Sequence, residues 1–95
     1  MRRTRRAKKL PNIIGFVFVR VEPVSRIKPA YEHIRKNEKV VEMHEVTGEY
    51  DILCKVTADN PEEFRETLDY IRQAMGIKKV EVMISYHQIK PEIKL

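Results

Sequence analysis

The stretch that decides the fold runs K39-V40-V41-E42-M43-H44-E45-V46-T47-G48-E49-Y50-D51-I52-L53-C54-K55-V56-T57. It predicts two strands, Lys39–Thr47 and Tyr50–Thr57, bounded by residues that favour turns. Gly48-Glu49 between them fits a two-residue turn, because Gly adopts the positive φ that such tight turns require. The middle of the chain is therefore predicted to be a β-hairpin.

A strand and a helix precede this hairpin. Ile13–Val21 is rich in β-branched and aromatic residues and ends before Pro23, which predicts the first strand. Ser25 is a candidate cap for the helix that follows. An apolar stripe at helical spacing defines that helix: Ile27, Ala30, Tyr31 and Ile34.

A second helix and a last strand follow the hairpin. Asn60 is a typical helix cap and Pro61 suits the first helical position. Gly76 is expected to stop the helix, and Ile77–His87 is the predicted fourth strand. The apolar stripe of this helix is Phe64, Leu68, Ile71 and Met75.

The order β-α-β-β-α-β limits the topology. Right-handed crossovers in both βαβ halves give a four-stranded antiparallel sheet in the order 4-1-3-2, with both helices on one face. This is the ferredoxin-like α+β fold. We expect residues 1–12 to be a basic disordered arm, 13–88 the folded domain, and 89–95 a tail or short edge strand.

The first strand also predicts self-assembly. A strand with one face in water should alternate apolar and polar residues, yet both faces of this strand are apolar. A second subunit would cover the outer face, so we expect a homodimer or a higher even-numbered oligomer. A strand that is simply rich in β-forming residues is the alternative. The predicted interface residues are Phe16, Val17, Phe18 and Val19.

The net charge of +5 comes from the first nine residues. The six basic residues there are Arg2, Arg3, Arg5, Arg6, Lys8 and Lys9. Without them the chain carries 13 basic and 14 acidic residues, so the predicted folded part is close to neutral. Any nucleic-acid binding is therefore expected to be weak and confined to the arm, and a solvated tail is the other interpretation.

The sequence holds no motif of a known catalytic or cofactor site. It has no P-loop, GxGxxG, GxSxG or HExxH pattern, and its three histidines lack the spacing of metal ligands. Cys54 is the only cysteine, which excludes an internal disulfide and suits a reducing cytoplasm. No apolar run is long enough to cross a membrane. We predict a cytoplasmic protein that is not an enzyme and needs no metal or cofactor.

The hairpin is the one candidate binding site. A tight turn followed by Asp51 presents backbone N–H groups and a carboxylate together, which suits the carboxylate and ammonium of a zwitterion. Ordinary turn chemistry would also explain Gly48 and Asp51, because both residue types are common in turns.

The segment from Glu45 to Val56 resembles the central motif of the effector-binding domain, or RAM domain, of the Lrp/AsnC family of transcriptional regulators. Ile14–Val21 resembles the opening strand of that domain, and Asn60–Phe64 its second helix. The resemblance implies a domain that dimerises through its sheets, often assembles further into rings of dimers, and binds an amino acid or related small molecule between dimers. By this resemblance the ligand-binding residues are Thr47, Gly48, Tyr50 and Asp51.

Two features differ from the family pattern. We expect no helix-turn-helix in this sequence, since the twelve residues of the arm are too few to build one. Val80 and Val82 stand where many family members carry threonines near the ligand. We therefore expect a stand-alone effector-binding and oligomerisation module that acts on transcription or metabolism through partners, such as a helix-turn-helix relative. The alternative is a small RNA- or DNA-binding protein that uses a ferredoxin-like sheet and the basic arm.

Overall fold

The computed structural model describes residues 12–91. Its strands are β1 (Ile13–Val21), β2 (Val40–Glu45), β3 (Ile52–Ala58) and β4 (Ile77–Ser85). Its helices are the 3₁₀ turn η1 (Val24–Arg26), α1 (Ile27–Ile34) and α2 (Pro61–Arg72). Neither α-helix of this described part has the length or apolarity needed to span a membrane.

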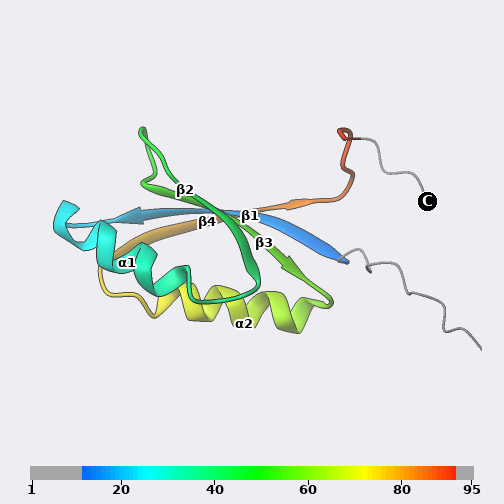
Figure 1. The fold of residues 1–95 in the computed structure, drawn as a ribbon, viewed down its shortest axis with the longest axis horizontal. Coiled ribbons are helices and arrows are strands. Elements are labelled where there is room, and N and C mark those ends of the chain that lie inside the picture. The colour runs from blue at the N-terminus through cyan, green and yellow to red at the C-terminus, as the bar shows by residue number, and fades with distance from the viewer. Residues whose placement is uncertain (1–11, 92–95) are drawn as a thin grey trace, which may run out of the picture.

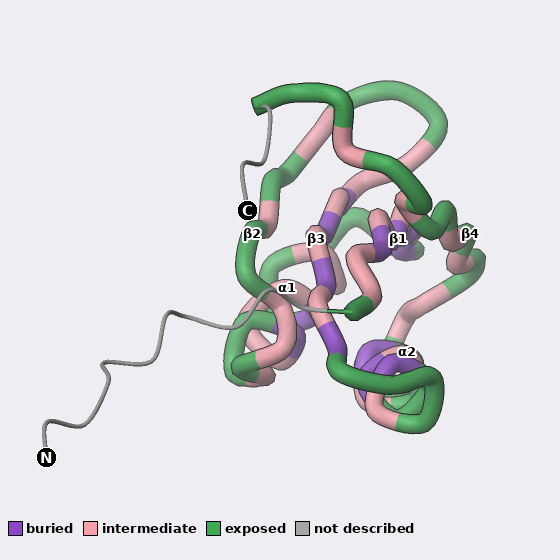
Figure 2. The backbone as a smooth tube through the Cα atoms, turned by 90° about the vertical axis from the view of Figure 1, so that its right-hand side faces the viewer, coloured by how far each residue is buried: buried purple, intermediate pink, exposed green. Residues whose placement is uncertain are grey.

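The four strands form one antiparallel sheet in the order β2-β3-β1-β4. Both helices lie on the same side of it, with α1 below β2 and β3 and α2 toward the β1–β4 side (Figures 1 and 2). This is the order 4-1-3-2 read from the other edge. The predicted ferredoxin-like α+β fold is confirmed.

The core lies between the sheet and the helices. Alternate residues of the central strands β1 and β3 point into it, as the two-residue period of a strand requires. Val17 and Val19 are completely buried on this covered face. Phe16 and Phe18 have the opposite parity and lie half-buried on the open face. Val17 and Val19 therefore drop out of the predicted interface, because the protein's own helices already cover them.

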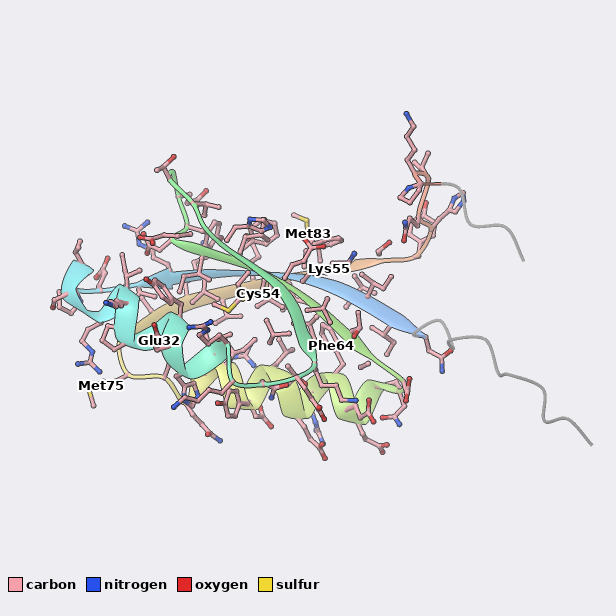
Figure 3. All side chains as sticks on the ribbon, viewed as in Figure 1. Glu32, Cys54, Lys55, Phe64, Met75 and Met83 are labelled. Carbon is pink, nitrogen blue, oxygen red and sulfur yellow. The ribbon has the colours of Figure 1, made fainter. Side chains whose placement is uncertain are left out.

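Helix α2 begins as predicted. The Asn60 side-chain oxygen accepts a hydrogen bond from the Glu63 backbone N–H at 2.8 Å, and Pro61 is the first helical residue. The helix ends at Arg72, before the turn that contains Gly76. Met75 consequently lies beyond the helix and is 69% exposed, so its predicted place in the apolar stripe is wrong (Figure 3).

Helix α1 starts differently from the prediction. The turn η1 leads directly into it, and neither element has a side-chain cap, so Ser25 is not the predicted cap. The predicted apolar stripe is confirmed, since Ala30 and Ile34 are buried and Ile27 and Tyr31 pack against the core.

The two helices are joined by a reciprocal contact. The His33 and Tyr70 rings stack with centroids 4.1 Å apart. The Tyr70 hydroxyl donates to the His33 carbonyl at 2.7 Å, and His33 Nε2 lies 2.8 Å from the Tyr70 carbonyl oxygen. This contact fixes α1 beside α2 on the covered face.

The structure adds detail at both ends of the described part. Asn12, assigned to the arm, donates from its side chain to the Asp59 carbonyl at 2.6 Å. Strand β4 ends at Ser85, two residues before the predicted end at His87, and residues 86–91 form no strand. The basic residues of the arm and the last four residues of the tail lie outside the described part.

A close contact between Gly15 and Phe64 generates a prediction. A Cβ at Gly15 would lie 2.4 Å from the Phe64 ring, so Gly15→Ala forces this buried ring to move. We expect a loss of about 1–3 kcal/mol in the free energy of unfolding, measured by urea denaturation. In Phe64→Leu the same Gly15→Ala change should cost clearly less. Equal costs in both backgrounds would contradict this contact.

Candidate functional site

The hairpin between β2 and β3 is longer at its tip than predicted. The Val46 N–H donates to the Asp51 carbonyl at 2.9 Å, which leaves a four-residue loop, Thr47–Tyr50. The predicted two-residue turn is therefore wrong. Gly48 does have the predicted positive φ, at 118°. The pairing of β2 with β3 ends at Glu45 and Ile52, before the predicted strand ends at Thr47 and Tyr50, because the residues between them form the loop.

The loop bends toward the open face of the sheet. Figure 1 shows the β2–β3 connection rising on the side opposite the helices. The Tyr50 ring packs against Phe18 with centroids 5.6 Å apart and planes inclined by 54°. Its hydroxyl donates to the Glu81 carboxylate on β4. Tyr50 thus joins the loop to two strands of the open face.

Asp51 anchors the base of the same loop. Its backbone N–H donates to the Val19 carbonyl at 2.8 Å. One oxygen of its carboxylate, Oδ2, accepts the Val21 N–H at 2.7 Å. The second bond lies where the pairing of β1 with β4 shifts register between Arg20 and Val21. The side chain predicted to bind a ligand therefore also supports the backbone of β1.

Charged side chains surround the loop. Arg20 donates from Nη1 to the Glu49 carbonyl at 2.8 Å, and the Lys79 ammonium lies 3.9 Å from the Glu49 carboxylate. The Glu81 carboxylate accepts the hydrogen bond of the Tyr50 hydroxyl and raises the pKa of this phenol. Lys79 also lies 5.6 Å from the centre of the Tyr50 ring.

Sequence reasoning missed Arg20, Lys79 and Glu81. Arg20 is an even number of residues from Phe16 and Phe18, so it lies on the same face of β1. The alternation of side chains along a strand could therefore have predicted its place on the open face. Lys79 and Glu81 depend on the register of β4, which pairs them with Arg20 and Phe18. No local signal in the sequence fixes that long-range register.

The four predicted ligand residues fall within one loop and its base but have different surroundings. Thr47 and Gly48 are exposed, whereas Tyr50 and Asp51 are half-buried and hold the loop in place. Val80 and Val82 pair with Val19 and Val17, so they share the covered face and do not line the loop. The β4 side chains beside the loop are those of Lys79 and Glu81.

The open face carries the remaining predicted interface residues. Cross-strand pairing places Leu53 beside Phe18, and Met83 beside Phe16. Met83 is 59% exposed and lies on the side of the sheet opposite Phe64 (Figure 3).

Cys54 lies on the covered face, where complete burial raises the pKa of its thiol to about 12. It is a core residue and does not join the loop.

Fold and site together define a ferredoxin-like α+β domain with an anchored hairpin loop beside an open sheet face that carries Phe16, Phe18, Leu53 and Met83. The model of the Lrp/AsnC ligand-binding domain matches residues 14–95. The chain belongs to the Lrp/AsnC family, which is a family of transcriptional regulators and not of enzymes.

Curated relatives are similar over most of this chain. An uncharacterized HTH-type transcriptional regulator of Pyrococcus furiosus is 40% identical over 82 residues, and one of Pyrococcus abyssi is 36% identical over the same length. Each match covers 83% of this chain and 55% of the relative. The chain thus spans about half the length of these relatives.

Solved structures with the same fold include TTHA0845 from Thermus thermophilus. It is 26% identical with a TM-score of 0.74, and the match covers 80% of this chain and 95% of that one. Escherichia coli AsnC has a TM-score of 0.79 at 17% identity, with 97% of this chain and 64% of that chain covered. The regulator NMB0573 from Neisseria meningitidis, solved as an L-Met complex, has a TM-score of 0.75 at 19% identity, with coverage of 92% and 62%. The last two similarities concern the fold.

The bond between Asp51 and Val21 predicts different effects for two substitutions. Asp51→Ala leaves the part-buried Val21 N–H without its acceptor and should lower the free energy of unfolding by about 1–3 kcal/mol. Asp51→Asn keeps an amide oxygen as acceptor and should cost clearly less. Urea denaturation of both variants is the measurement. Equal losses would show that this bond does not hold the loop.

Proposed function

We propose that this chain is a regulatory module that assembles through its open sheet face and binds an amino acid at the Thr47–Asp51 hairpin. The observation that carries the proposal is the contact of the hairpin with that face, through Tyr50 on Phe18 and Glu81. The module acts on transcription or metabolism through partners, among them a helix-turn-helix relative. Membership of the Lrp/AsnC family supports this function.

The apolar surface on the open face is what a second copy covers. It consists of Ile14, Phe16 and Phe18, which follow one another on the same face of β1, and of their neighbours Leu53 and Met83, which pair with Phe18 and Phe16. Lys55 and Glu42, whose charged groups lie 3.8 Å apart, flank it on the β2 side. An apolar centre with a polar border is typical of a protein interface. Two copies related by a two-fold axis bury the same surface on each other, and larger even-numbered assemblies add further contacts.

The hairpin supplies groups for both ends of an amino acid. In the loop, backbone N–H groups hold the carboxylate, and Gly48 allows close approach because nothing lies within 4 Å of the place where its Cβ would be. Asp51 pairs with the ammonium through the oxygen that Val21 does not use. The similar fold of the Neisseria meningitidis regulator, solved as an L-Met complex, supports this class of ligand.

Self-assembly is tested with a charge on the open face. The wild-type chain should be a dimer or a larger even-numbered oligomer at micromolar concentration, by light scattering after size exclusion. Phe16→Lys places a cation opposite Lys55 and should give a monomer, since an unpaired charge is costly to bury. Gln73→Lys adds the same charge at the exposed end of α2 and should leave the assembly intact. A monomeric wild type would refute the proposed interface.

Effector binding is tested by a thermal-shift screen of amino acids followed by calorimetry with the best ligand, which stabilises the native state by mass action. Asp51→Asn should weaken binding by about 1–3 kcal/mol, because it removes the charge that pairs with the ammonium. Asp69→Asn, the same change on the exposed surface of α2, should bind like the wild type. If Asp51→Asn binds as tightly as the wild type, the effector does not bind at the hairpin.

A further inference from the structure

A hollow of about 320 Å³ lies between α1 and the edge strand β2, at the base of the hairpin. Because α1 residues line it, the hollow is on the helix side of the sheet. Figure 1 shows the hairpin tip bending toward the opposite, open face. The volume of the hollow is at the small end of the range for ligand sites. It is lined by Tyr31, Arg35, Met43, His44, Glu45 and Ile52.

The two walls of the hollow come from regular spacing on α1 and β2. Tyr31 lies in α1 and Arg35 is its C-cap residue, still in helical conformation; four residues apart, they project from the same side of the helix. Met43 and Glu45 are two residues apart on β2 and share one face. Their partners in β3 are Cys54 and Ile52, both buried on the covered side, so this face of β2 points toward α1.

Opposite charges and apolar surface meet in this hollow. The helix wall brings the Arg35 guanidinium, and the strand wall brings the Glu45 carboxylate. The one ion pair that Arg35 forms in the described part of the chain is with Glu32, at 3.3 Å, and its side chain is 63% exposed. Such a surface pair contributes little, so the guanidinium is available to a ligand. Glu45 forms no ion pair with any residue from 12 to 91. Between the charges lies the apolar surface of Met43 and Ile52.

We propose that this hollow binds a free α-amino acid with an apolar side chain. Arg35 receives the carboxylate in a forked, charge-assisted contact, and Tyr31 donates its hydroxyl to the same group. Glu45 accepts from the ammonium, and the ligand side chain covers Met43 and Ile52. The proposal rests on the proposed function for the class of effector, but it assigns a second site that lies within one chain and uses none of the Thr47–Asp51 residues.

The experiment is calorimetry on the full chain with L-leucine and two analogues, 4-methylpentanoate without the ammonium and isoamylamine without the carboxylate. Arg35→Gln and Glu45→Gln should each weaken L-leucine binding about tenfold or more. Arg35→Gln should leave isoamylamine binding unchanged, and Glu45→Gln should leave 4-methylpentanoate binding unchanged, since each analogue lacks the group that the altered residue recognises. Arg72→Gln and Glu66→Gln, exposed on α2, are the matched controls.

The outcomes separate the two sites. An L-leucine binding event that Arg35→Gln and Glu45→Gln weaken and Asp51→Asn leaves unchanged supports the hollow, and a second event that only Asp51→Asn weakens reports the hairpin. Loss in Asp51→Asn alone overturns the hollow and leaves the hairpin as the effector site. If neither L-leucine nor any other apolar amino acid binds the wild type, the hollow is refuted, and the proposed function keeps only its assembly interface. All three substituted side chains lie at the surface or half-buried, so thermal melts are expected to verify folded variants.

Discussion

The structure depends on the way Asp51 holds the β2–β3 hairpin against β1. Its backbone and side chain make two bonds to β1, one on each side of Arg20. Without the carboxylate the Val21 N–H would lose its acceptor at the point where the pairing with β4 shifts. The same two bonds fix where the loop leaves the sheet, and therefore where Tyr50 meets Phe18. Asp51 thus anchors the base of the loop, and the contacts of Glu49 and Tyr50 hold the rest of it over the open face.

Side chains alternate between the two faces of the sheet along each strand, so the covered face and the open face carry different kinds of residues. On the covered face, small branched residues such as Val17 and Val19 fit closely under the helices, and Gly15 leaves room for the Phe64 ring. On the open face, Phe16 and Phe18 present larger side chains that the chain itself covers only in part. Burying them needs a surface that a domain of this size does not contain. The partial exposure of these two aromatic side chains is the physical argument for assembly.

Local signals in the sequence predicted most of the fold. The Asn60-Pro61 cap and the positive φ of Gly48 are decided by neighbouring residues, and right-handed crossovers then determine the strand order. Which parity of β1 faces the helices was not predictable, because both parities are apolar. The second bond of Asp51 and the position of Glu81 beside Tyr50 depend on contacts between residues about 30 positions apart. Such contacts join residues far apart in the sequence, so no local pattern encodes them.

The hairpin connects the two faces of the sheet. Its ends, Glu45 and Ile52, line the hollow on the helix side, while its tip packs through Tyr50 on the open face. A ligand in the hollow and a second copy on the open face would therefore bias the same four-residue loop. Any free energy that couples the two events acts equally in both directions, so a ligand that favours assembly must itself bind the assembled form more tightly. The contacts that would carry this coupling are those that hold the loop, namely Asp51 on β1, Tyr50 on Phe18 and Glu81, and Glu49 beside Arg20 and Lys79.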